Sequence, residues 1–218
     1  MQVASRTEVG HVRRRNEDAL YVAPPLGVVA VADGLGGHPA GDLASRTATE
    51  SLRDTVSATP PPGGAANEQW LTETLLTAHR AVLATAGDDP GLTGMATTAV
   101  LAVVGADGAW LAHVGDSRAY LQPAGEPVRQ VTEDHGLGGY ITQALGLDRG
   151  VTPDVTRLGL AAGDRLLLCT DGLSNMVDQA TIGRLLAEGD VQGAVDGLVQ
   201  AALDAGGIDN VTVVVVEV

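Results

Sequence analysis

Three apolar runs in this sequence each lie beside an acidic residue at a turn, and this pattern limits the folds that the chain can adopt. Val28–Ala32 runs into Asp33, Leu166–Cys169 leads to Asp171, and Asp209 stands just before Val211–Val216. Short, continuous apolar runs are typical of strands that are buried on both faces. If these strands are neighbours in one core, their carboxylates converge at one end of it.

Each acidic residue, taken singly, has a simpler interpretation as a turn residue, because Asp-Gly and Asp-Asn are common turn pairs. A cluster of buried carboxylates is different, since like charges raise each other's pKa and require a counter-charge. The chain has no lysine, so all 13 of its basic residues are arginine. An all-oxygen ligand set selects Mg²⁺ or Mn²⁺ rather than Zn²⁺. The pattern therefore predicts a site for divalent cations.

The composition predicts one domain, residues 1–218, with a core of Val, Leu, Ile and Ala, because Phe is absent and aromatic residues make up 2%. The single cysteine, Cys169, excludes an internal disulfide and a cysteine-rich metal site. A net charge of −14 disfavours nucleic acid and anionic membranes as partners. The sequence contains no apolar run of roughly 18 residues and no signal-peptide pattern, so we expect a cytoplasmic protein.

The periodicity predicts an α+β fold. Four segments have helical spacing: Asp42–Ser57, Glu68–Ala86, Thr181–Glu188 and Val191–Ala205. Four short segments from Thr97 onward are expected to form an antiparallel meander: Thr97–Val104, Ala109–Val114, Arg118–Leu121 and Val128–Val131. We expect a four-layer α-β-β-α sandwich, with two stacked, mainly antiparallel sheets and helices on both outer faces.

Short motifs in a fixed order then resemble a known family, the metal-dependent serine/threonine phosphatases of type 2C, in their bacterial form. They lie at residues 12–19 (VRRRNEDA), 31–38 (VADGLGGH), 94–98 (GMATT), 114–120 (VGDSRAY), 132–135 (TEDH), 170–173 (TDGL) and 209–212 (DNVT). One such tetrapeptide would be a weak signal, whereas the whole ordered set is specific and covers nearly the whole chain.

The resemblance implies roles for individual residues. Asp33 would bridge two cations, the Gly34 carbonyl would complete one ligand set, and Asp171 and Asp209 would bind the first cation. Glu17 and Asp18 would orient waters around the cations, and Arg13 would bind the phosphoryl group. A hydroxide bridging the two cations would attack phosphorus in line and expel the serine or threonine alkoxide.

Asp116 has two interpretations of equal weight: it helps to bind a third, weaker ion, or it is a plain hairpin aspartate. His38, His113 and His135 are expected to be structural. Some relatives have a histidine where this chain has Leu35, which leaves the general acid unassigned. Bacterial relatives also insert a helical flap after the motif that ends at His135, whereas here only residues 136–140 follow before the next matching segment.

The expected substrate is a phosphorylated protein, the product of a serine/threonine kinase. Two alternatives remain open: a weakly active or silent module that binds phosphoproteins, and a phosphatase for small phosphoesters. A cysteine phosphatase is excluded because Cys169 is not followed by a phosphate-binding loop, and a serine hydrolase because the chain lacks a G-x-S-x-G elbow.

Overall fold

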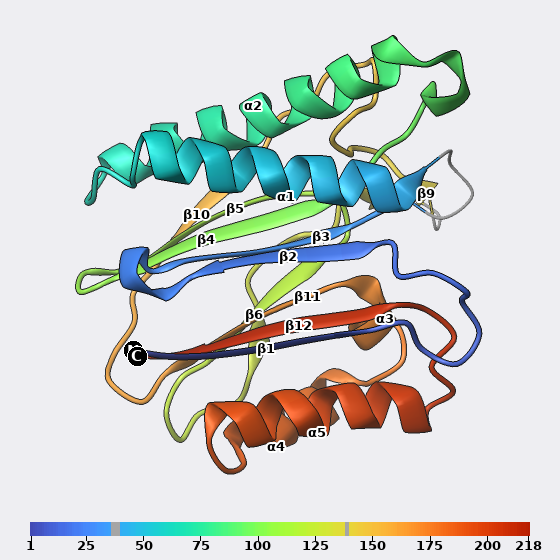
Figure 1. Ribbon diagram of the computed structural model, residues 1–218. Helices are drawn as coiled ribbons and strands as arrows, with labels where there is room; N and C mark the ends of the chain where they lie inside the picture. The colour runs from blue at the N-terminus through green and yellow to red at the C-terminus, as the bar shows by residue number, and fades with distance from the viewer. Residues whose placement is uncertain (36–39, 138–139) are drawn as a thin grey trace.

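The computed structural model of the protein describes residues 1–35, 40–137 and 140–218, and it has four layers (Figure 1). The order of layers is a helix pair, a five-stranded sheet, a second five-stranded sheet and further helices. The predicted α+β sandwich is therefore confirmed. Gly36, Gly37 and His38 lie outside the described residues, as do Gly138 and Gly139, so the predictions made for them are not addressed by the structure.

The first sheet has the strand order β10-β5-β4-β3-β2 and is antiparallel throughout. Its strands are β2 (Asp18–Ala23), β3 (Val28–Asp33), β4 (Ala99–Gly105), β5 (Gly108–Val114) and β10 (Asp154–Leu158). The helices α1 (Gly41–Ala58) and α2 (Ala66–Asp88) cover its outer face.

The second sheet has the order β1-β12-β11-β6-β7 and is also antiparallel. Its strands are β1 (Gln2–Glu8), β6 (Arg118–Gln122), β7 (Arg129–Gln130), β11 (Arg165–Cys169) and β12 (Val211–Glu217). The helices α3 (Asp171–Ser174), α4 (Gln179–Ala187) and α5 (Val191–Asp204) pack on this side. Two 3₁₀ turns, Pro24–Leu26 and Pro90–Leu92, and a small hairpin, β8 (Gly136–Leu137) with β9 (Tyr140–Ile141), complete the described elements.

The expected meander is wrong, because its four strands belong to two different sheets. β4 pairs with β5, and β6 pairs with β7, but β5 and β6 do not pair with each other. The chain crosses from one sheet to the other at Gly115-Asp116-Ser117, where Gly115 has a φ of 105°. Strand periodicity is the same on both sides of such a crossing, so it does not reveal it.

Strand β3 shows how the two sheets form one core. Val28 and Ala30 pack in a cluster with α1 and α2, whereas Val29 and Val31 pack in a cluster with residues of β11 and β12. All four side chains are buried, as predicted for an apolar run without alternation. This packing fixes the position of β3 relative to the opposite sheet, and therefore the position of Asp33 at its end.

No helix in the described part of the chain combines the length and apolar character that crossing a membrane requires. The cytoplasmic location stays a prediction.

Candidate metal centre and phosphate site

The topology brings acidic residues from several strands to one end of both sheets. In an antiparallel sheet the end of one strand lies beside the start of the next. β3 therefore ends at Asp33 directly opposite Asp18, the first residue of β2. In the other sheet, Asp171 follows β11 and Asp209 precedes its antiparallel neighbour β12. The convergence of carboxylates predicted from the sequence is present.

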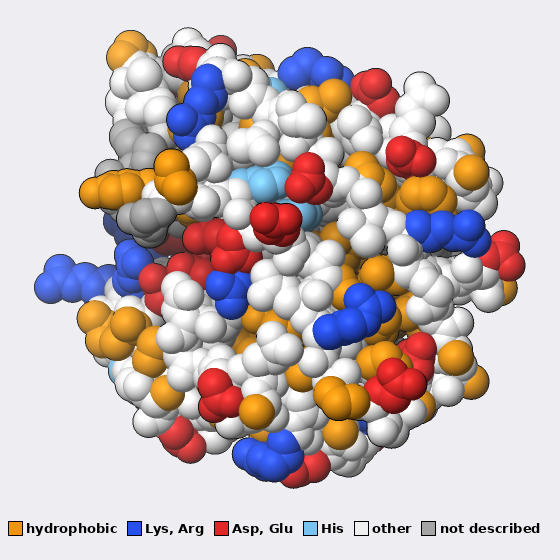
Figure 2. All heavy atoms as spheres, turned by 180° about the vertical axis from the view of Figure 1, so that it is seen from behind, with side chains coloured by type: hydrophobic (Ala, Val, Ile, Leu, Met, Phe, Trp, Pro, Cys, Tyr) orange, Lys and Arg blue, Asp and Glu red, His pale blue; other side chains and the backbone are white. Residues whose placement is uncertain are grey.

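A cavity of about 650 Å³ opens at this end of the sheets, and its walls include most of the predicted site. The predicted residues that line it are Arg13, Asp33, Gly34, Asp116, Asp171 and Asp209. Figure 2 shows acidic side chains gathered at one edge of this face, with hydrophobic and arginine side chains next to them. The structure thus places Asp116 in the same cavity as the other aspartates.

Asp18 and Glu17 lie behind this wall rather than on it. Asp18 is buried, and its Oδ2 accepts hydrogen bonds from Thr170 Oγ1 at 2.9 Å and Thr212 Oγ1 at 2.7 Å. Its Oδ1 is buried without a hydrogen-bond partner among the described residues. Glu17 takes part through its backbone, because its carbonyl accepts from the Gly34 N–H at 3.0 Å. The supporting roles expected for both residues stay a prediction.

Burial and mutual repulsion disfavour the charged form of these carboxylates. Burial raises the pKa of Asp18 to about 7 and that of Asp116 to about 6. Burial also raises the pKa of Asp33 well above its ordinary value, with further contributions from Asp18 and Asp171. The pKa of Asp171 is raised by burial and by Asp209. The cluster therefore requires positive charge if it is to be ionised at neutral pH.

The residues present fit hard divalent cations. The donors are all oxygen, the chain has no lysine, and Asp18 Oδ1 is a buried acceptor without a donor. The side chain of Arg13 makes the one ion pair with this set in the described structure: its Nη2 lies 2.7 Å from Asp209 Oδ2. One guanidinium at the rim cannot neutralise four converging carboxylates, whereas two divalent cations can.

Asp33 and Asp171 approach each other within hydrogen-bonding range, but no three carboxylates of the described cluster have ligand atoms within 4.8 Å of one another. Among the described residues, the one group whose candidate ligand atoms all lie within 4.8 Å of one another is His113, His135 and Asp154. This group is a poor metal site, because the two imidazole rings are stacked at 4.7 Å with 25° between their planes. The nitrogen lone pairs lie in the ring planes, so stacked rings cannot direct them to a single ion. His135 Nδ1 instead accepts from the Gly115 N–H at 3.2 Å.

Two glycines are required by close backbone packing at the site. A Cβ on Gly34 would lie 2.1 Å from the Gly41 carbonyl oxygen, and one on Gly172 would lie 1.8 Å from the Asn210 carbonyl oxygen. A side chain at either position would push apart the segments that carry Asp33, Asp171 and Asp209. Each Asp-Gly pair therefore combines an aspartate that lines the cavity with a glycine that close packing requires.

Comparison with known proteins decides the family. The sequence profile described as "Protein phosphatase 2C" matches residues 10–201. The chain belongs to the protein phosphatase 2C family. Family membership confirms the enzyme class predicted from the sequence, a protein serine/threonine phosphatase.

Named relatives come from several bacteria. The serine/threonine phosphatase Stp of Listeria innocua is 34% identical over 242 residues, which cover 100% of this chain and 96% of the relative. PstP of Mycobacterium tuberculosis is 35% identical over 238 residues, which cover 100% of this chain but 45% of the relative. Both alignments are longer than the 218 residues of this chain, so these relatives contain residues without a counterpart here.

Solved structures share the fold. A crystal structure of the M. tuberculosis phosphatase PstP has a TM-score of 0.89 and 34% identity, covering 100% of this chain and 98% of that one. A second structure, of the PstP catalytic domain in complex with two manganese ions, has a TM-score of 0.88 and 34% identity and covers 99% of this chain and 97% of that one. A family member with this fold therefore binds two Mn²⁺ ions.

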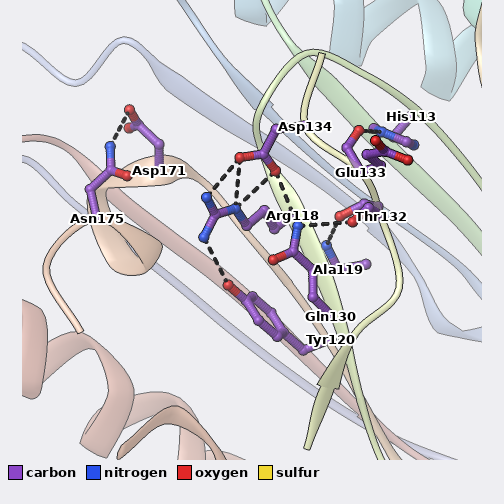
Figure 3. Close-up of polar contacts among 10 residues, drawn as sticks. All are labelled: His113, Arg118, Ala119, Tyr120, Gln130, Thr132, Glu133, Asp134, Asp171 and Asn175. Carbon is purple, nitrogen blue, oxygen red and sulfur yellow. Dashed lines mark hydrogen bonds and ion pairs between the residues drawn. The ribbon is translucent and has the colours of Figure 1, made fainter. Parts of the chain in front are cut away.

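Several residues that fix the loops around the cavity were not predicted from the sequence, and Figure 3 shows some of them. Arg118 binds both oxygens of Asp134, at 2.7 Å for the shortest contact, and ties the TEDH segment to β6. Asn210 accepts from the Glu17 N–H and donates to the carbonyls of Val9 and Arg15, which fixes the loop that carries Arg13. These residues lie inside the motifs at 114–120, 132–135 and 209–212. Their place in those motifs is the sequence signal that could have identified them.

Asn175 is the positioning residue that acts most directly on a candidate ligand. Its Nδ2 donates to Asp171 Oδ2 at 3.0 Å, one helical turn further along the chain (Figure 3). We expect Asn175→Ala to weaken Mn²⁺ binding by about tenfold, because partners that orient a ligand typically contribute 10–100-fold to affinity. Calorimetric titration with Mn²⁺ measures this directly.

A matched control for Asn175→Ala is Gln200→Ala on α5. Gln200 Nε2 donates to Asp204 Oδ1 at 2.7 Å with the same four-residue spacing, and neither residue lines the cavity. The control is expected to keep the Mn²⁺ affinity of the wild type. Equal affinities for the Asn175 variant and the wild type would exclude the positioning role.

Proposed function

We propose that this chain hydrolyses phosphoserine and phosphothreonine in proteins with the help of two divalent cations, Mg²⁺ or Mn²⁺. The observation that carries the proposal is one cavity in which Asp33, Asp116, Asp171 and Asp209 converge with Arg13 at the rim. The protein-bound phosphate would be the product of a serine/threonine kinase. Residues 1–218 would act as one catalytic domain, which the core shared by the two sheets supports.

The aspartates take different parts in this proposal. Asp33 lies at the centre of the cluster and would hold both cations, and the Gly34 carbonyl would complete the ligand set of one of them. Asp171 and Asp209 would bind the first cation. Asp116 would contribute to a third, weaker ion, which its raised pKa and its place beside Asp171 support. Asp18, held by Thr170 and Thr212, and Glu17 would hold water molecules around the cations.

When bound, the cations would supply a water molecule activated as the nucleophile and the charge that stabilises the phosphoryl oxygens. The fork of the Arg13 guanidinium suits two phosphoryl oxygens, and its position at the cavity rim lets substrate reach it. Leu35 lines the cavity, and no histidine is among the described residues of its walls.

Hydrolysis of a phosphothreonine peptide tests the proposal. We expect release of inorganic phosphate that requires Mn²⁺ or Mg²⁺ and stops on addition of EDTA, with recovery when the ion is restored. Phosphopeptide binding without turnover would instead favour a silent binding module. Turnover of sugar phosphates at rates well above those of phosphopeptides would favour a phosphatase for small phosphoesters.

A further inference from the structure

The hairpin β8–β9 presents two unusually exposed apolar side chains. Leu137 is 78% exposed and Tyr140 is 79% exposed, more than any other large hydrophobic residue in the described part of the chain. The two residues lie directly opposite each other in the antiparallel register, so their side chains share one face of the hairpin. Exposed apolar side chains that adjoin one another form a contiguous patch, and such patches mark interaction sites in soluble proteins.

Hydrogen bonds hold the hairpin at its base, where the chain enters and leaves it. The Gly136 N–H donates to the Asp134 carbonyl at 2.8 Å, and the Thr142 N–H donates to the His135 carbonyl at 2.7 Å. Asp134 is itself fixed by Arg118, and the His135 N–H donates to the Gly115 carbonyl at 2.9 Å beside Asp116. The position of the apolar pair relative to the aspartates is therefore set by the protein core.

The apolar pair continues into the candidate active site. Tyr140 lines the same cavity as Asp33 and Asp171, and so do Ile141 and Leu147. A phosphoryl group fills only a part of about 650 Å³, so the rest of the cavity receives the groups next to it in the substrate. The charged residues on this side, Asp148 and Arg149, have opposite signs and give it no net charge.

We propose that Leu137 and Tyr140 form a docking surface for a large apolar side chain next to the phosphorylated residue of a protein substrate. An extended peptide advances about 3.3 Å per residue, so a side chain within roughly three positions of the phosphoresidue reaches this wall. A small phosphoester has no such side chain and gains nothing from it. The proposal rests on the proposed function and names a preference among its substrates.

Peptide pairs measure this preference. In each pair, one phosphothreonine peptide has leucine next to the phosphothreonine and the other has serine at the same positions. Separate pairs carry the exchange before the phosphothreonine, after it, or on both sides. Burial of about 50 Å² of apolar surface, at about 25 cal/mol per Å², corresponds to roughly a tenfold effect on kcat/KM. We expect the wild type to prefer the leucine peptide by about tenfold, and the double variant Leu137→Ser/Tyr140→Ser to reduce that ratio to about one.

The control variant is Leu26→Ser, which removes an exposed leucine (42% exposed) from a 3₁₀ turn outside the cavity and is expected to keep the ratio. Equal rates of the wild type on the two peptides would overturn the proposal. So would a double variant that slows both peptides alike and keeps the tenfold ratio. If the wild type shows no metal-dependent turnover of any substrate, the proposed function is overturned, and the docking surface with it.

Discussion

Replacement of Asp33 by asparagine is expected to lower kcat/KM by at least about 10³-fold, the largest effect of any single substitution in this chain. Asparagine keeps the size of the side chain but removes the charge at the centre of the cluster, and loss of one preorganised electrostatic contact typically costs 10²–10³ in rate. In the proposed site Asp33 would contact both cations, so both would bind the variant more weakly. The measurement is phosphate release from a phosphothreonine peptide at saturating Mn²⁺.

The stability of the same variant separates loss of function from loss of fold. Burial raises the pKa of Asp33 far above its ordinary value, so a neutral asparagine suits the metal-free fold at neutral pH. We therefore expect metal-free Asp33→Asn to unfold at a higher temperature than metal-free wild type at pH 8. Asp107→Asn, in the exposed turn between β4 and β5, is the matched control and should keep full activity. An Asp33 variant with a tenth or more of wild-type activity would rule out the bridging role.

Removal of metal is expected to make stability fall as pH rises. Asp18 has a folded pKa of about 7, above its ordinary value, so the folded state holds its proton more tightly than the unfolded state does. The stabilisation that the Asp18 proton contributes is complete below the unfolded-state pKa of about 4. It is lost as pH rises through the folded-state pKa of about 7. For Asp18 alone the difference is roughly 4 kcal/mol, and the raised pKa values of Asp33, Asp116 and Asp171 act in the same direction.

Thermal unfolding in EDTA at a series of pH values between 4 and 8 measures this loss. A change of roughly 4 kcal/mol corresponds to about 10 °C in Tm for a chain of this length. Saturating Mn²⁺ should restore at pH 8 the stability that the metal-free protein has lost, because a ligand that binds the folded state alone stabilises it. Asp18→Asn should flatten the metal-free profile. Metal-free stability that rises or stays constant between pH 5 and 8 would contradict the account.

The elements of the fold follow largely from local patterns. The helix periodicity placed α1, α2, α4 and α5 to within two residues of their ends, and the apolar run Leu166–Cys169 covers all of β11 but its first residue. Strand β10 was missed because Asp154–Leu158 alternates polar and apolar residues weakly and stands at the edge of its sheet. Helix α3 was read as a turn, since its four residues are too few to show a period.

The sequence by itself determined the chemistry of the site. The order of the motifs, the acidic residues beside apolar strands and the absence of lysine together predicted an all-oxygen site for hard cations, because the donor types and their total charge are properties of composition. Tertiary structure alone decided how the site is assembled. The crossing at Gly115-Asp116-Ser117 brings Asp116 to Asp171, and the packing of Val29 and Val31 on the opposite sheet brings Asp33 to Asp209. It also decided that Tyr140 lines the cavity with Leu137 opposite it in the hairpin, since contacts between residues far apart in sequence depend on which faces pack, and strand periodicity does not specify this.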